Sequence, residues 1–136
     1  MALVVDCSVT MSWCFRDEAT RYTEDVFDRL RGEAAVVPAI WPLEVANTLL
    51  VAERRGRITG AEALHFVQVL HGSSIAVDTL DVMTVIDRVL ELGRLYRLSA
   101  YDAAYLELAA REGLPLATLD ERLRSAATRL GVPLVE

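Results

Sequence analysis

Four acidic residues stand where they could do chemistry together, each after an apolar run or in the first turn of a helical segment. They are Asp6, Glu44, Asp102 and Asp120. In a parallel sheet the carboxyl ends of all strands lie at one edge, where ligands usually bind. Carboxylates gathered there repel one another, and a Mg²⁺ or Mn²⁺ ion relieves that repulsion because it prefers oxygen ligands. The pattern therefore predicts a site for a divalent metal ion.

Asp6 is the most informative of the four acids. It ends the apolar run VVD, in a place where a strand that only packs in a core would not carry a charged side chain. Such a carboxylate needs a partner, and a hard divalent cation is one that suits it. Asp6 is therefore the acid for which a metal is the better interpretation.

The alternative for each acid taken singly is helix capping, because helix N-termini favour carboxylates. Ser99 and Asp102 fit a capping box, and Thr118 begins a second one with the Glu three residues later. Two further acids at a junction of this kind, Asp78 and Asp81, show that position alone does not separate a metal ligand from a cap. The spacing thus yields candidates and leaves their assignment open.

Short apolar runs alternate with longer segments of helical period, which predicts an α/β fold around a parallel sheet. We expect four to five short strands flanked by about seven helices. The expected strands are residues 3–6, 35–37, 75–77 and 116–118, with 134–135 as a further edge strand. The expected helices are a short one from about residue 8, then 20–30, 42–55, 59–71, 81–96, 99–112 and 120–130.

Length and composition suit one compact domain over residues 1–136, since 53% of them are hydrophobic. No apolar run approaches the roughly 18 residues of a membrane span, and the first residues lack the bases of a signal peptide. We therefore expect a cytoplasmic protein with no membrane partner. Cys7 and Cys14 lack the spacing of a zinc site or a disulfide framework, which predicts buried, reduced thiols.

Charge restricts the function further. The net charge of −6 argues against binding nucleic acid through bulk electrostatics, unless the acids are concentrated in a pocket that cations fill. Every basic side chain is Arg and none is Lys, which excludes Schiff-base and P-loop chemistry. The missing lysine also disfavours a receiver domain and a haloacid dehalogenase-like phosphatase, and the latter would want an acid where Ser8 stands.

Several motifs in this order resemble the PIN domain family, and particularly the VapC-type toxins of bacterial toxin–antitoxin pairs. The motifs are VVDCSVTMSWCF, WPLEVANTLL, AERRGRIT and LSAYDAAYLELAAREGLPLATLDERL, which together span nearly the whole chain. The resemblance implies a parallel sheet with helices on both faces, an α/β/α sandwich. It also implies that Asp6, Glu44, Asp102 and Asp120 form a catalytic metal-binding cluster, with Asp6 and Asp102 as the most direct ligands.

The same resemblance implies an activity. It is metal-assisted hydrolysis of phosphodiester bonds in single-stranded RNA, with Mg²⁺ or Mn²⁺ lowering the pKa of a bound water. Ser8 and Thr118 would support the acids, and Asn47 lies one turn beyond Glu44, where a surface hydrogen bond is an equal explanation. His65 and His71 lie within a helical segment and are not needed as bases.

The remaining expectations concern partners. Arg54, Arg55 and Arg57 form a compact basic cluster that could meet phosphates, although a solvated turn is the commoner explanation. Broad apolar helix faces at 45–51 and 64–70 predict a homodimer. The resemblance implies a small cognate antitoxin. A PIN nuclease of housekeeping RNA processing, and a catalytically silent module that binds RNA or protein, remain alternatives.

Overall fold

A four-stranded parallel sheet forms the centre of the computed structural model, which describes residues 1–79 and 81–136. The strands are β1 (Ala2–Val5), β2 (Ala34–Val37), β3 (Ile75–Val77) and β4 (Leu116–Ala117). Their order is β3-β2-β1-β4, and every neighbouring pair is parallel. The expected fifth strand is reduced to one parallel bridge between Leu116 and Leu134. β1 is thus an inner strand, and the acid that follows it lies in the middle of the sheet.

Seven α-helices and one short 3₁₀ helix surround this sheet, which confirms the expected α/β class. The α-helices are α1 (Cys7–Ser12), α2 (Arg21–Arg29), α3 (Trp41–Arg54), α4 (Gly60–His71), α5 (Val82–Tyr96), α6 (Ala100–Glu112) and α7 (Glu121–Leu130). The 3₁₀ helix, η1 (Arg16–Glu18), was not predicted from the sequence. None of the helices in the described ranges has both the length and the apolar character needed to cross a membrane.

Local signals explain where several helices begin. The Thr59 hydroxyl accepts a hydrogen bond from the Glu62 N–H and the Glu62 carboxylate accepts one from the Thr59 N–H, so α4 opens with the expected capping box. α3 begins at Trp41 with Pro42 in its first turn, where a missing N–H costs nothing. Asp81 caps α5 through the Thr84 N–H. These caps set the direction in which each helix leaves the sheet.

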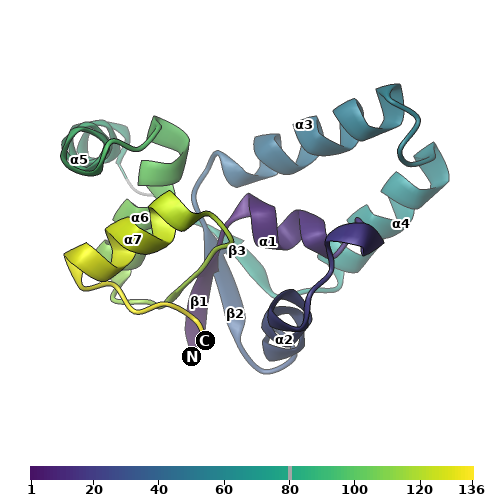
Figure 1. The fold of residues 1–136 in the computed structure, drawn as a ribbon, viewed down its shortest axis with the longest axis horizontal. Helices are drawn as coiled ribbons and strands as arrows, with labels where there is room; N and C mark the ends of the chain where they lie inside the picture. The colour runs from purple at the N-terminus through teal and green to yellow at the C-terminus, as the bar shows by residue number, and fades with distance from the viewer. Residues whose placement is uncertain (80) are drawn as a thin grey trace.

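Side chains of β1 alternate between two apolar clusters, one on each face of the sheet. Leu3 and Val5 pack with Val9 of α1 and Val26 of α2. Val4 faces the other way, into the larger cluster built from α3, α4, α6 and α7. Figure 1 shows α6 and α7 on one side of the strands and α2 on the other, with α1 and α3 starting from the upper ends of β1 and β2. The sheet is therefore covered on both faces, and α1 and α3 begin at its carboxyl edge.

A buried ion cluster joins α6 to the loop after β3. Arg111 donates to both carboxylate oxygens of Glu107 and, at 2.7 Å, to Asp78. Glu112 is its third partner, at 2.8 Å. The Glu107 side chain is only 2% exposed. The charge of Glu107 is thus compensated although it lies in the core. Asp78, a possible cap by sequence, is instead an ion-pair partner.

This cluster predicts a large effect of Arg111→Met on stability. Removing the guanidinium leaves the Glu107 charge buried without a partner, which typically costs about 3–5 kcal/mol. Urea unfolding of the purified variant measures the loss. Arg31→Met is the matched control, because the Arg31 side chain is 81% exposed and its removal should change the free energy of unfolding by less than about 0.5 kcal/mol. Equal losses in the two variants would contradict the role given to Arg111.

Candidate active site

Asp6 lies directly after β1 and is held by three hydrogen bonds. One carboxylate oxygen accepts from the Val9 N–H at 3.1 Å, which makes Asp6 the cap of α1, and also from the Ser8 hydroxyl. The other oxygen accepts from the Thr118 hydroxyl. The residue is only 5% exposed, so these donors replace the water that an ionised carboxylate would otherwise bind. Capping and a functional role therefore coexist at Asp6.

Thr118 joins the ends of β1 and β4. Its hydroxyl donates to Asp6 and accepts from the Asp120 N–H at 3.0 Å, so it does not open a capping box with Glu121 as expected. Asp120 caps α7 itself, by accepting from the Leu123 N–H at 2.9 Å. A hydrogen bond from the Thr118 hydroxyl to the Asp6 carboxylate is charge-assisted, and it is therefore stronger than a bond to a neutral backbone group of a capping box.

Glu44 lies in the first turn of α3, half-buried, and its partner comes from a distant helix. The Tyr105 hydroxyl of α6 donates to Glu44 Oε1 at 2.6 Å. Tyr105 is 1% exposed and belongs to the large apolar cluster. Sequence reasoning gave Tyr105 no role, and the only available signal was a hydroxyl within an otherwise apolar helical face. A contact between residues 61 positions apart is not visible in local spacing.

Asp102 lies in the first turn of α6, half-buried, and only half of its expected capping box is present. The Ser99 hydroxyl accepts from the Asp102 N–H at 3.1 Å, so Ser99 caps the helix. Within the described residues, the Asp102 carboxylate accepts no hydrogen bond from the Ser99 N–H. The equivalent bond is present in α4, where the Glu62 carboxylate accepts from the Thr59 N–H. The Asp102 carboxylate therefore does not close the capping box, although the nearby Ser99 side chain lowers its pKa.

The four acids lie close enough to influence one another electrostatically. The pKa values of Asp6, Glu44 and Asp102 are all raised above those of an ordinary carboxyl, and burial is the main cause in each case. Repulsion adds to it: Asp102 raises the pKa of Asp6, Asp6 and Asp102 raise that of Glu44, and Asp120 raises that of Asp102. Hydrogen bonds from Ser8, Thr118 and Val9 oppose the shift at Asp6, and the Tyr105 bond opposes it at Glu44. Folding thus gathers repelling carboxylates at one edge of the sheet.

This donor set suits a hard cation. The acids supply only oxygen atoms, and partly buried carboxylates that repel one another are stabilised by a positive ion between them. Within residues 1–79 and 81–136, no three acidic, His or Cys side chains already converge as closely as the ligands of one metal would. Mg²⁺ does not require such a cage, because it commonly binds through one or two carboxylates, waters and substrate phosphates. The residues present therefore fit an open site of that kind.

Ser8 and Thr118 contact Asp6 as described above, whereas the arginines proposed for substrate binding lie elsewhere. Asn47 is exposed on α3, one turn beyond Glu44. Arg57 donates to Asp17 and Glu18, at 2.9 and 2.8 Å, and its guanidinium lies 3.8 Å from the centre of the Phe15 ring. This arginine is therefore bound to η1 and its flanking residue.

The other two arginines of the basic cluster, Arg54 and Arg55, are exposed at the far end of α3. Arg54 follows Glu44 by ten positions, or about 15 Å along the helix axis. The structure therefore does not bring the basic cluster into contact with the acids.

Cys7 and Cys14 are free thiols that are only partly buried, so the expectation of full burial was wrong. Cys7 is the first residue of the short helix α1 and Cys14 lies two residues beyond its end, where side chains reach the surface. Burial and the neighbouring Glu44 raise the pKa of Cys7 to about 12, and burial likewise raises that of Cys14. Cys7 therefore remains a neutral thiol at pH 7 and adds no charge to the site.

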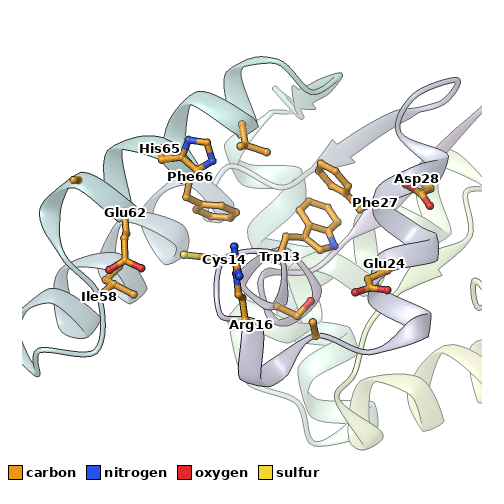
Figure 2. Close-up of a pocket in the computed structure, with 14 residues that line it drawn as sticks. Trp13, Cys14, Arg16, Glu24, Phe27, Asp28, Ile58, Glu62, His65 and Phe66 are labelled. Atoms are coloured by element: carbon orange, nitrogen blue, oxygen red, sulfur yellow. The ribbon is translucent and has the colours of Figure 1, made fainter.

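An apolar cleft of about 750 Å³ lies between α1, α2 and α4, and none of the four acids lines it. Figure 2 shows Trp13 and Phe27 on one side and His65 and Phe66 of α4 on the other. The two rings of the Trp13–Phe27 pair are 5.0 Å apart. Further lining residues at its margin are the acids Glu24, Asp28 and Glu62 and the base Arg16. The cleft is thus a second surface feature, apolar with a mainly acidic margin.

Exposed apolar side chains gather on a helix that the sequence did not single out. On the two faces expected to pair copies of the chain, Val45, Leu49 and Phe66 are buried in the core, four further apolar residues are partly buried, and Leu50 and Leu64 are exposed. α5 carries more of them, namely Val82, Met83, Ile86, Leu90 and Leu95. Helical spacing puts most of these on one side of α5. The more apolar outer face therefore belongs to α5.

Comparison with known proteins agrees with the fold. The sequence profile of the PIN domain family matches residues 3–128. The chain belongs to the PIN domain family. A PIN protein of similar length, Ribonuclease VapC3 from Pyrobaculum aerophilum, is 29% identical over 98% of this chain and 100% of its own.

Solved structures show the same PIN fold. The crystal structure of PAE2754 from Pyrobaculum aerophilum is 26% identical, covers 93% of this chain and 87% of its own, and superposes with a TM-score of 0.70. A toxin–antitoxin complex from Klebsiella pneumoniae contains a chain with a TM-score of 0.58 and 13% identity, over 87% of this chain and 86% of its own. The expected PIN fold, with helices on both faces of a parallel sheet, is therefore confirmed.

The raised pKa of Asp102 predicts how stability changes with pH when no metal is added. A carboxyl whose pKa is higher in the folded state than in the unfolded state binds its proton more tightly when folded. The stabilisation from that proton is complete at low pH and is lost as pH rises through the folded-state pKa. In EDTA, we expect Asp102→Asn to unfold a few degrees above the wild type at pH 7, and this gap to narrow toward pH 4.

Thermal unfolding followed by circular dichroism measures this difference. Asp25→Asn serves as the control, because Asp25 is an exposed acid of α2 and its removal should give no such gain. A wild type more stable than Asp102→Asn at pH 7 in EDTA would show that repulsion does not dominate at Asp102.

Proposed function

We propose that this PIN protein is a Mg²⁺- or Mn²⁺-dependent endoribonuclease that hydrolyses phosphodiester bonds in single-stranded RNA. The observation that carries the proposal is the electrostatic coupling of Asp6, Glu44, Asp102 and Asp120 at one edge of the sheet. The name of a relative that matches over its full length, Ribonuclease VapC3, supports RNA as the substrate.

Each acid would make a distinct contribution. Asp6 and Asp102 would hold the cation, since Asp6 is kept in place by three donors and the Asp102 carboxylate is not used in capping. Glu44 and Asp120 would complete the ligand set through oxygens or bound waters. When bound, the ion would lower the pKa of a water and stabilise charge on the phosphate oxygens. His65 lines the cleft of Figure 2 instead of this site, so no histidine base is assigned.

The protein would act as the toxin of a toxin–antitoxin pair. A chain of the same fold occurs in the Klebsiella pneumoniae toxin–antitoxin complex. The apolar cleft between α1, α2 and α4 offers a docking place, and its margin carries more acids than bases. We therefore assign to it an antitoxin segment that presents apolar side chains flanked by arginine or lysine.

The exposed side of α5 would pair two copies of the chain. Long apolar side chains on one side of a helix usually mark a covered surface, and a twofold dimer is the commonest way to cover it in a protein of one kind. Val82, Ile86 and Leu90 lie one turn apart in succession. The dimer of this proposal is therefore formed through α5.

The purified protein is expected to cleave single-stranded RNA with Mg²⁺ or Mn²⁺ and to lose the activity in EDTA. Asp102→Asn should reduce the rate by at least about 100-fold while circular dichroism shows an intact fold, because one direct ligand is lost. Asp25→Asn controls for the loss of one negative charge. Undiminished cleavage in EDTA would rule out the metal mechanism, and no cleavage under any condition would favour a silent binding module.

Induced expression of the wild type should arrest bacterial growth, because cleavage of cellular RNA stops protein synthesis. Asp102→Asn should allow growth, and co-expression of a cognate antitoxin encoded by an adjacent short gene should restore growth to the wild-type strain. Colony counts after induction measure both effects. Normal growth of cells that contain active wild-type enzyme would point to housekeeping RNA processing instead.

A further inference from the structure

Tyr105 connects the core of the protein to the acidic site. Its ring packs in the large apolar cluster, and its hydroxyl reaches across from α6 to Glu44 on α3, with an oxygen–oxygen distance of 2.6 Å. The two helices are far apart in the sequence. This is the single hydrogen bond that joins Glu44's carboxylate to another side chain in the described part of the chain.

The hydroxyl is not needed for packing. Burying a hydroxyl costs free energy unless it finds a partner, and a phenylalanine would fill nearly the same space without that cost. At 1% exposed, Tyr105 has given up contact with water, and its one hydrogen bond goes to Glu44. The contact with the Glu44 carboxylate therefore explains why position 105 carries a tyrosine and not a phenylalanine.

A second buried contact already fixes the helix that carries Glu44. The Trp41 indole N–H donates to the Thr10 hydroxyl at 3.0 Å, and that hydroxyl donates to the Asp6 carbonyl at 3.0 Å. Trp41 is the first residue of α3, and all three residues are buried. The backbone near Glu44 is thus held relative to Asp6. These contacts do not fix the Glu44 side chain, which has three rotatable bonds and loses considerable conformational entropy when it is ordered.

We propose that Tyr105 is a positioning residue, which holds the Glu44 carboxylate through Oε1 and would leave Oε2 free for a cation that Asp6 and Asp102 would also hold. The inference rests on the proposed metal-dependent function. A hydrogen bond from a buried residue behind a ligand orients it and removes the ordering cost at the moment of binding. Tyr105 does not touch the substrate in this scheme and acts only through Glu44.

Tyr105→Phe removes the hydroxyl and keeps the ring. Losses of this kind typically lower metal affinity or activity by about 10- to 100-fold. We expect Mn²⁺ affinity, measured by electron paramagnetic resonance without RNA, to fall about tenfold. With RNA, kcat should fall similarly and KM should change less than about twofold, because substrate contacts are kept. Tyr101→Phe is the control, since Tyr101 lies on the same helix and is 59% exposed.

Glu44 variants test whether the effect passes through this acid. Glu44→Asp keeps the charge but withdraws the carboxylate by one methylene, so it should resemble Tyr105→Phe. In a Glu44→Ala background, adding Tyr105→Phe should lower Mn²⁺ affinity and kcat by less than about twofold, because the carboxylate that accepts the Tyr105 hydrogen bond is already removed. An equal loss in both backgrounds would overturn the inference.

The remaining outcomes are also decisive. If Tyr105→Phe unfolds at a lower temperature but binds Mn²⁺ and cleaves RNA as the wild type does, Tyr105 is structural only, while the proposed function stands. If the wild type cleaves no RNA, the proposed function fails, and the Mn²⁺ titration still decides the role of Tyr105. If the wild type binds no Mn²⁺, the inference fails with the metal site.

Discussion

Repulsion among carboxylates held at one edge of a parallel sheet is the constraint around which this structure is arranged. β1 is an inner strand, so the acid that follows it is surrounded by the ends of its neighbours. Burial raises the pKa of three of the four acids, and their mutual repulsion raises it further. Such an arrangement costs stability in the metal-free chain. Active sites commonly keep costs of this kind, because an unfavourable field between like charges attracts a ligand of the opposite charge.

Neutral hydrogen-bond donors hold Asp6 and Glu44 in place, and within the described residues no cationic side chain contacts either carboxylate. Ser8, Thr118 and the Val9 N–H serve Asp6, and Tyr105 serves Glu44. A neighbouring arginine would neutralise the carboxylates and compete with a metal, whereas a hydroxyl orients them and leaves their charge available. Arg111 belongs to another cluster, where it compensates the buried Glu107. The charge of Glu107 is therefore neutralised within the protein, whereas Asp6 and Glu44 are bonded only to neutral donors in the described residues.

The placement of arginine also bears on how a protein of net charge −6 would approach RNA. Arg57, one member of the basic cluster, is bound to Asp17 and Glu18 and stacked on Phe15. Its partners lie about 40 positions earlier in the chain, so no local pattern reveals them. Neutralisation of phosphate would then depend on the cation in the acidic site as well as on exposed arginines such as Arg54 and Arg55.

The sequence by itself determined the α/β class, the approximate bounds of strands and helices, the capping box at Thr59 and the PIN resemblance, because these follow from local periodicity and short motifs. It also indicated the four acids through their place at the ends of strands and starts of helices. Tertiary structure decided which of the acids Thr118 contacts, that Tyr105 holds Glu44, and that Arg57 is occupied. Those contacts join residues about 40 to 112 positions apart, and such distances are closed only by packing of the core.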